Sequence, residues 1–275
     1  MRGVVLEAGG EKILLVADTH VGYEAELRLK GIYAVSQTQR LLENLRSWGE
    51  EAGASSIAIL GDIKHELPTP RETAGEVREF LKALAKAFEK VILIPGNHDS
   101  LIDEISQGID GVYLLDSRGL LLEGPRTVLL LHGHAKPRLE DFQRADVVVM
   151  GHTHPAVPIV DEIGYITREH AIIKTDQDKG LVAKRMFGAE VSGRVRFIIL
   201  PASHPLITGF DVVNLPSLSK DDRTILKYLD LSPEKIEVYL TDFTYLGTLD
   251  VISASRGQMG PDAEAVEALS STDYD

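Results

Sequence analysis

Short apolar runs recur along the first 150 residues, and each run stops abruptly at glycine, proline, aspartate or histidine. The runs are Ile13–Ala17, Ile57–Leu60, Val91–Ile94, Val128–Leu131 and Val147–Met150. Four or five consecutive apolar residues between such breaks are typical of strands that are buried on both faces. We therefore expect five core strands here, and a further strand at Arg194–Leu200.

The segments between the first three runs have helical spacing. Ser36–Gln39 predicts a capping box that opens a helix through Leu41 and Leu45. Thr69–Glu72 predicts a second capping box, with proline at the first helical position, ahead of apolar residues spaced three and four apart in Val77–Leu84. This strand–helix–strand order predicts a parallel sheet, in which the carboxyl ends of the strands meet at one edge.

After Leu114 the predicted strands follow one another with few helices between them, starting with Leu120–Leu122. We therefore expect a second sheet packed on the first. The stretch 161–193 has poor periodicity and many lysine, aspartate and glycine residues. We expect an irregular excursion or a flexible loop there.

The C-terminal part predicts a closing hairpin and then a tail. Glu237–Leu240 and Tyr245–Val251 have the composition of two short strands. From Ser253 on the chain is polar and acidic, and we expect it to be disordered. The sequence thus predicts one domain over residues 1–252 and an acidic tail over residues 253–275.

Charge and composition limit the class of protein. The chain has 275 residues, a formal net charge of −13 at pH 7 and no cysteine. This charge disfavours broad electrostatic capture of nucleic acid, but an acidic enzyme can act on a phosphate ester if metal ions supply the positive charge. No apolar run approaches the ~18 residues of a membrane span. We expect a cytoplasmic protein without a membrane partner, disulfides or thiolate ligands.

The candidate chemistry lies in five polar clusters, each of which follows an apolar run. They are Asp18-Thr19-His20, Gly61-Asp62, Gly96-Asn97-His98-Asp99, His132-Gly133-His134 and Gly151-His152-Thr153-His154. These clusters hold six of the nine histidines, a concentration that ordinary packing does not require. Carboxylate and neutral imidazole suit Mn, Fe, Zn, Ni or Co better than Ca or Mg. The pattern predicts a metal site where the strands end.

The order and wording of the clusters resemble the calcineurin-like metallophosphoesterase superfamily, with motifs running from Asp18 to His154. The resemblance implies an α/β fold, a four-layer α/β/β/α double-sheet sandwich, and a centre of two metal ions. It implies that the first ion is held by Asp18, His20, Asp62 and His154. It implies that the second ion is held by Asp62, Asn97, His132 and His152, so that Asp62 bridges the two ions.

The resemblance also implies a reaction. We expect two divalent transition-metal ions per chain, with Mn preferred and Fe, Zn, Ni or Co as alternatives. A shared carboxylate holds two ions ~3.5–4 Å apart, and a hydroxide that bridges them would attack the phosphate. His98 would protonate or stabilise the leaving oxygen, and Asp99 would orient the ring of His98.

Four further residues are candidates for contact with the substrate or for support of the ligands. Lys64 or His65 could touch the substrate phosphate, or both could belong to a capped turn. His134 could lie near the second metal or be a plain loop histidine. His204, in the loop Pro201–Pro205, could line the pocket, although a surface loop is the preferred interpretation.

Several motifs resemble a branch of predicted archaeal and bacterial phosphoesterases that includes the bacterial ligase-associated phosphoesterase linked to DNA repair. These motifs are Gly61–Glu66, His132–His134, Gly151–Val157 and Leu200–Ala202. The resemblance favours a phosphodiesterase that acts on a nucleotide or nucleic acid, with a nucleic acid or a DNA-repair protein as partner.

The alternative is a phosphomonoesterase acting on a small metabolite. A non-catalytic scaffold is less favoured, because His98 and all seven ligand positions are present. The sequence predicts no oligomeric state.

Overall fold

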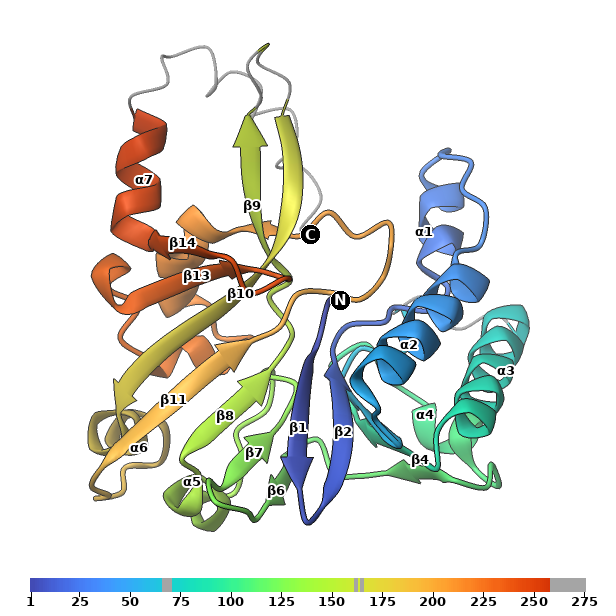
Figure 1. Ribbon diagram of the computed structural model, residues 1–275, viewed down its shortest axis with the longest axis horizontal. Coiled ribbons are helices and arrows are strands. Elements are labelled where there is room, and N and C mark those ends of the chain that lie inside the picture. The colour runs from blue at the N-terminus through green and yellow to red at the C-terminus, as the bar shows by residue number, and fades with distance from the viewer. Residues whose placement is uncertain (66–70, 161–162, 164–165, 258–275) are drawn as a thin grey trace.

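Two β-sheets pack face to face in the computed structural model, and helices cover the outer face of each sheet (Figure 1). The structure describes residues 1–65, 71–160, 163 and 166–257. Three apolar clusters separate the layers in the order helix, sheet, sheet, helix, which confirms the predicted α/β/β/α sandwich. Across the described residues, no helix has both the length and the apolar character that crossing a membrane requires.

The first sheet, as far as the structure describes it, has five strands in the order β1-β2-β3-β4-β5. Their bounds are Val4–Ala8 (β1), Glu11–Val16 (β2), Ser56–Leu60 (β3), Lys90–Ile94 (β4) and Val112–Leu114 (β5). β2, β3 and β4 are parallel, as predicted, whereas the parallel strand β5 and the antiparallel edge strand β1 were not predicted. The helices of this half are α1 (Tyr23–Leu29), α2 (Thr38–Ala52), α3 (Arg71–Ala87) and α4 (Ile102–Ser106).

The described part of the second sheet has nine strands, and its main path runs β12-β9-β10-β11-β8-β7-β6. The bounds along the chain are Leu120–Leu122 (β6), Val128–Leu130 (β7), Val147–Met150 (β8), Pro155–Val160 (β9), Ile166–Asp178 (β10), Arg194–Ile199 (β11), Phe210–Asp211 (β12), Ile236–Leu240 (β13) and Tyr245–Thr248 (β14). β13 pairs with both β10 and β14. The helices are α5 (Leu139–Arg144), α6 (Lys179–Phe187) and α7 (Leu249–Gly257), with 3₁₀ turns η1 (Val212–Lys220), η2 (Ile225–Tyr228) and η3 (Pro233–Lys235).

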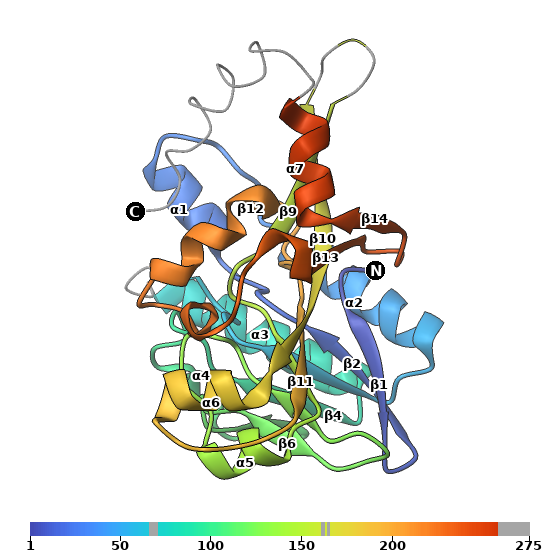
Figure 2. The same cartoon turned by 90° about the vertical axis from the view of Figure 1, so that its left-hand side faces the viewer.

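The core strands are buried on both faces, which explains their continuous apolar runs. In β2, Leu14 and Val16 pack toward α2 and α3. Ile13 and Leu15 point the other way and meet the second sheet, including Leu130 of β7. The outer face of the second sheet packs against α5, α6 and α7 (Figure 2). A shift of one residue would exchange the two faces of a strand, so this alternation fixes the register.

The expectation of an irregular excursion over residues 161–193 is wrong, because this stretch holds β10 and α6. The charged residues that suggested a loop form ion pairs across neighbouring strands. Lys174 Nζ lies 2.6 Å from Glu237 Oε2. Arg196 Nε lies 2.7 Å from Asp176 Oδ1. Lys174 and Asp176 therefore lie on the charged face of a half-buried strand.

The helix starts differ in detail from the predicted capping boxes. α2 begins at Thr38, so its N-cap is Gln37 and not Ser36. Ser36 Oγ still accepts a hydrogen bond from the Thr38 N–H, at 3.3 Å. The predicted cap of α3 at Thr69 and Pro70 lies outside the described residues.

The predicted hairpin near the C-terminus is correct for β13 and β14, but the second strand ends at Thr248 and not at Val251. α7 follows at once and buries Leu249 and Ile252, which are three residues apart on one helical face. The predicted domain boundary after residue 252 therefore falls inside a helix. Residues 258–275 of the predicted tail lie outside the described residues.

Candidate metal centre

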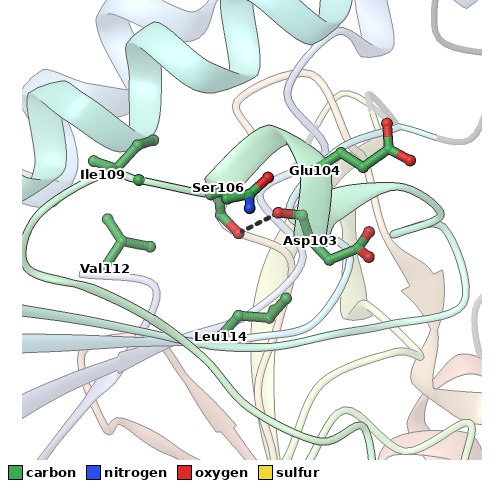
Figure 3. Close-up of a pocket in the computed structure, with 8 residues that line it drawn as sticks. Asp103, Glu104, Ser106, Ile109, Val112 and Leu114 are labelled. Carbon is green, nitrogen blue, oxygen red and sulfur yellow. Dashed lines mark hydrogen bonds between the residues drawn. The ribbon is translucent and has the colours of Figure 1, made fainter.

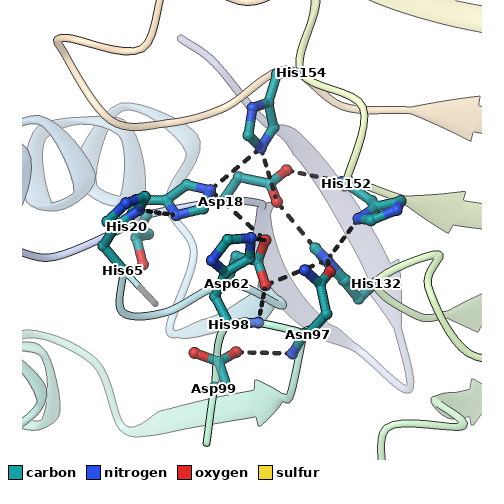
Figure 4. A network of polar contacts seen from close by, with 12 residues as sticks. Asp18, His20, Asp62, His65, Asn97, His98, Asp99, His132, His152 and His154 are labelled. Carbon is teal, nitrogen blue, oxygen red and sulfur yellow. Dashed lines mark hydrogen bonds and ion pairs between the residues drawn. The ribbon is translucent and has the colours of Figure 1, made fainter. Parts of the chain in front are cut away.

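The five polar clusters converge where strands of both sheets end, as the strand pattern predicted (Figure 4). Asp18 follows β2, Asp62 follows β3, and the turn 96–99 follows β4. His132 and His152 follow β7 and β8 of the second sheet. The expected ligands thus come from both sheets and meet between them.

Most of the expected ligands have a left-handed backbone. Within the described chain, seven non-glycine residues have positive φ, and five of them are expected ligands: Asp18 (55°), His20 (39°), Asp62 (47°), His152 (77°) and His154 (45°). Such conformations cost on the order of 1–3 kcal/mol each and persist only where the surroundings enforce them. Here the His20 N–H donates to the Asp62 carbonyl at 2.8 Å, which ties the turns after β2 and β3 together.

Two motif glycines allow the backbone to pass close to the carboxylates. A Cβ on Gly96 would lie 2.1 Å from Oδ1 of Asp62. A Cβ on Gly151 would lie 2.4 Å from Oδ2 of Asp18. Neither position can carry a side chain unless a carboxylate moves. The glycines of these motifs are thus part of the geometry that holds the carboxylates in place.

The first ligand set consists of Asp18, His20, Asp62 and His154, all of them buried. One ligand atom from each residue lies within 4.8 Å of the others. His20 Nε2 is 3.3 Å from His154 Nε2 and 3.6 Å from Asp62 Oδ2. Asp18 Oδ1 is buried, and within the described residues it has no hydrogen-bond partner, although His154 Nε2 is only 3.3 Å away. A divalent cation would satisfy this oxygen.

The second ligand set consists of Asp62, His132 and His152, again with ligand atoms within 4.8 Å. His132 Nε2 lies 3.4 Å from Asp62 Oδ1 and 3.2 Å from Asn97 Oδ1. His152 Nδ1 is 3.1 Å from the same Nε2 atom. The four side chains expected around the second ion are therefore gathered on one side of Asp62.

The hydrogen bonds of two histidines indicate which ring nitrogens carry lone pairs. His132 Nδ1–H donates to the Leu60 carbonyl at 2.9 Å, and His152 Nε2–H donates to the Arg223 carbonyl at 3.2 Å. The remaining nitrogens, His132 Nε2 and His152 Nδ1, face each other, and both are acceptors once His132 has lost its second proton. A metal ion placed between two such acceptors is coordinated by both, as in histidine sites whose second nitrogen binds a carbonyl. The residues therefore fit a metal ion.

The charges around His132 favour a cation as well. Burial lowers the pKa of this imidazole, but the carboxylates of Asp62 and Asp18 outweigh burial and raise it to about 9. For His152 burial dominates, and with the neighbouring His132 it lowers the pKa to about 3. A neutral His152 beside two buried carboxylates is a suitable ligand, because only the neutral imidazole can bind metal.

His98 lies at the accessible side of the two ligand sets. Its backbone N–H donates to Asp62 Oδ1 at 3.0 Å, and its Nε2 is 3.8 Å from Asp62 Oδ2. The ring stacks on His65 with centroids 5.5 Å apart and an interplanar angle of 21°. Its side chain is 22% exposed, against 2% for Asp62, so it can reach a substrate placed above the ligands.

We expected Asp99 to orient the ring of His98, but its carboxylate accepts hydrogen bonds from two backbone N–H groups. Its Oδ2 accepts from the Gly96 N–H at 2.7 Å, and its Oδ1 accepts from the Lys64 N–H at 3.1 Å. Burial, together with the charge of Asp62, raises the pKa of Asp99 to about 6. These contacts connect the turn after β3 to the turn after β4, so Asp99 supports the backbone around His98.

Lys64 was a candidate for contact with the substrate phosphate, and His134 for a position near the second metal. Lys64 lies inside the protein, and His134 lies beside a ligand. The side chain of Lys64 is fully buried, and its Nζ donates to the His98 carbonyl and to Ser100 Oγ. Lys64 therefore supports the same turn as Asp99. The His134 ring lies 5.2 Å from the ring of His132, beside the second ligand set. Burial and the charge of His132 lower the pKa of His134 to about 4.

His65 contacts the first ligand set through His20. Its other partner, Glu26, is a residue that the sequence analysis did not find. His65 Nδ1 lies 3.3 Å from His20 Nδ1, and His65 Nε2 contacts Oε2 of Glu26. If the His65 Nε2–H donates to Glu26, then His65 Nδ1 is an acceptor for the His20 Nδ1–H. His20 Nε2 is then left with a lone pair directed at the metal position. Glu26 lies in α1, a helix of seven residues that no periodicity signal revealed.

The preferred surface position for His204 is wrong, because its side chain is buried with 1% exposure. The Ser203 N–H donates to the Ala17 carbonyl at 2.9 Å, so the loop runs beside the end of β2. His204 Nε2 is 3.4 Å from Oε1 of Glu24, and the ring meets that of Tyr23 at 5.6 Å. The loop therefore reaches the edge of the site, where His204 supports the start of α1.

A separate surface hollow lies beside α4 and β5 (Figure 3). Its lining includes Asp103, Glu104, Ser106, Ile109, Val112 and Leu114. No expected ligand or catalytic residue is among the residues that line it. The hollow is thus distinct from the metal centre.

Comparison with known proteins gives one family match and several solved structures. The model of the calcineurin-like phosphoesterase superfamily domain matches residues 12–169. The nuclease MPE of Pseudomonas putida is 20% identical, with a TM-score of 0.45, over 86% of this chain and 96% of that chain. The phosphoesterase Yfce of E. coli is 22% identical, with a TM-score of 0.35, over 56% and 75% of the two chains.

Vps29 of Entamoeba histolytica, solved as a complex with zinc, is 16% identical, with a TM-score of 0.33, over 72% of this chain and 79% of that chain. A search of the curated proteins found no match. The matched family region contains all five polar clusters and covers more than half of the chain. The chain therefore belongs to the calcineurin-like phosphoesterase superfamily, a family of metal-dependent hydrolases.

Proposed function

We propose that this protein is a two-metal phosphodiesterase that hydrolyses a nucleotide or nucleic-acid phosphodiester. The observation that carries the proposal is the position of Asp62 between the two ligand sets. Its Oδ1 lies 3.4 Å from His132 Nε2, and its Oδ2 lies 3.6 Å from His20 Nε2. One carboxylate with each oxygen directed at a different ligand set is the arrangement that a pair of bridged ions needs.

The ligands for each ion are those implied by the sequence motifs. Asp18, His20, Asp62 and His154 would hold the first ion, and Asp62, Asn97, His132 and His152 would hold the second. When bound, the ions would activate a water molecule and neutralise charge on the phosphate. Mn is the first choice for this mixed oxygen and nitrogen donor set, with Fe, Zn, Ni and Co as alternatives.

The protein itself would supply the proton for the leaving group. Hydrolysis of a phosphodiester releases an alkoxide. An alkoxide is a poor leaving group and needs a proton donor, whereas a good leaving group can depart without one. His98 is placed to be that donor. Its backbone is anchored to Asp62, and its ring is held between His65 and His20. The buried supports Lys64 and Asp99 limit the movement of this turn. A scaffold without catalysis would have no need for this accessible imidazole.

The test compares a diester with a monoester. Metal-stripped protein is titrated with Mn, and hydrolysis of bis(p-nitrophenyl) phosphate and of p-nitrophenyl phosphate is followed at each metal concentration. We expect turnover of the diester that depends on Mn. Turnover of the monoester alone would favour the alternative, a phosphatase acting on a small metabolite.

The bridge is tested by Asp62→Asn, with the exposed Asp250→Asn in α7 as a matched control. Elemental analysis should find that Asp62→Asn loses metal from both sites, because one carboxylate is shared. Asp250→Asn should retain two ions per chain. Two ions retained in Asp62→Asn would rule out the bridge and with it this mechanism.

A further inference from the structure

The segment that follows the first ligand motif projects apolar side chains into solvent. Leu29, Ile32, Tyr33 and Val35 are all exposed, and Tyr33 has the largest exposed fraction, 87%. We call residues 23–37, which comprise α1 and the loop after it, the α1 finger. Figure 1 shows α1 projecting from the half of the molecule that contains the first sheet. Four exposed apolar residues within seven positions are unusual on a surface that does not bind anything.

The base of the α1 finger is joined to the metal centre. The Tyr23 ring meets the ring of His65 edge-on, with centroids 5.0 Å apart. Glu26 contacts the other side of His65, and His65 in turn stacks on His98. The finger therefore begins beside the residue expected to protonate the leaving group. Seven helical residues place its tip ~10 Å further out.

The conformation of the finger is held by hydrogen bonds. Glu24 Oε1 accepts from the Gln37 N–H at 2.6 Å, which brings the two ends of the finger together. The Ile32 N–H donates to the Leu27 carbonyl at 2.8 Å, and an Arg28 N–H donates to the Ala34 carbonyl at 3.3 Å. The apolar tip is thus presented in one defined arrangement, so that binding would cost little ordering entropy.

The finger has no net charge, because Glu24 and Glu26 balance Arg28 and Lys30, whereas the chain has a net charge of −13. The acidic residues lie at its base, and residues 28–37 contain Arg28 and Lys30 and no aspartate or glutamate. Lys30 Nζ lies 2.8 Å from Glu26 Oε1. Cationic side chains beside an exposed aromatic ring are the combination by which proteins bind single-stranded nucleic acid, because bases stack on the ring and phosphates approach the charges. A purely apolar partner would not need the basic residues.

We propose that the α1 finger binds a single-stranded segment of a nucleic-acid substrate beside the scissile phosphate. Tyr33 stacks on an unpaired base, and Arg28 and Lys30 lie near the phosphates on either side of it. This inference rests on the proposed phosphodiesterase function, and it names the substrate class as a strand with accessible bases.

The experiment measures two activities and one binding constant for Tyr33→Ala, with Tyr33→Phe as the conservative variant. The control is Tyr113→Ala, because Tyr113 is an exposed aromatic residue of β5, away from the finger. For a single-stranded oligodeoxythymidylate, kcat/KM of Tyr33→Ala should fall roughly five- to hundredfold, the range that the loss of one stacked base gives. Tyr33→Phe and Tyr113→Ala should keep the wild-type value. Turnover of bis(p-nitrophenyl) phosphate, which is too small to reach the tip, should be unchanged in all three.

The outcomes separate this inference from the proposed function. Equal oligonucleotide kcat/KM in wild type and Tyr33→Ala would overturn the finger while leaving the phosphodiesterase intact. Equal losses on both substrates would also overturn it, because they indicate a disturbed site. If no diester is hydrolysed, fluorescence anisotropy with the labelled oligonucleotide decides: binding that weakens in Tyr33→Ala supports the finger, and unchanged binding contradicts it. A dimer that dissociates in Tyr33→Ala would assign the tip to a second copy of the chain and would also overturn the proposal.

Discussion

Replacing Glu26 with alanine should weaken metal binding at the first ligand set and leave the second set unchanged. Glu26 contacts His65, and His65 lies 3.3 Å from His20 through their Nδ1 atoms. Glu26 accepts the Nε2–H of His65 and so fixes the tautomer of His65. His65 Nδ1 then accepts the Nδ1–H of His20 and fixes the tautomer of His20. Without Glu26, His65 can turn its own Nδ1–H toward His20 and so favour the tautomer of His20 that does not bind metal.

The size of the effect follows from this geometry. Loss of a residue that orients a ligand typically lowers metal affinity 10- to 100-fold, or about 1.4–2.7 kcal/mol. Two features place Glu26 at the lower end of that range. Its side chain is 25% exposed, so solvent screens its charge, and one imidazole separates it from the ligand His20. We expect about a tenfold loss at the first site.

Isothermal titration of metal-stripped protein with Mn would measure both sites. Lys30→Ala is the matched control, because Lys30 Nζ lies 2.8 Å from Glu26 Oε1, whereas His65 contacts the other carboxylate oxygen, Oε2. This control should keep both affinities, and Glu26→Gln, which retains an acceptor, should lose less than Glu26→Ala. Unchanged affinity at both sites in Glu26→Ala would refute the relay. An equal loss at both sites would show that α1 acts on the whole centre and not through His20.

Two further predictions concern catalysis and backbone packing. His98→Ala should retain two ions per chain by elemental analysis but lose roughly 10²–10⁴-fold in turnover of an oligonucleotide, whose alkoxide leaving group needs a proton; full activity on the oligonucleotide would remove His98 from the mechanism. Gly151→Ala would place a methyl group 2.4 Å from Asp18 Oδ2 and 2.5 Å from Ala17 Cβ. It should therefore lower both the melting temperature and the affinity for Mn, whereas an unchanged melting curve would show that the turn has room to adjust.

The sequence predicts the core strands and the meeting of the ligands for one physical reason. A strand that is buried on both faces must be apolar along its length, so Leu60 is followed by an abrupt change to Gly61 and Asp62 where the strand leaves the core. The same reasoning fails for β10. Its charged residues pair across the sheet, and its buried Gln177 is satisfied by the backbone of Asp230, at 3.0 Å and 2.8 Å. Such partners are distant in sequence and give no local signal.

The finer geometry of the site was also beyond local patterns. His132 and His152 are oriented by the carbonyls of Leu60 and Arg223, which lie 72 and 71 residues away. Every residue has a carbonyl, so nothing in the sequence marks these two as partners. Glu26 is equally unmarked, because the seven residues of α1 are too few to show apolar periodicity. Sequence motifs therefore predicted the residue types at the centre but not the contacts that set their tautomers.

The position of the centre between the sheets connects packing to chemistry. Asp18 and Asp62 extend from the first sheet, whereas His132 extends from the second, and its Nδ1–H binds the carbonyl of the last residue of β3. Directly behind them, apolar side chains such as Leu15 and Leu130 fill the space between the same two sheets. The thickness and register of that apolar layer therefore set how far Asp62 lies from His132. A shift of one residue in either strand would turn a ligand away from its partner, so the apolar runs before each motif are part of the metal centre as much as the motifs themselves.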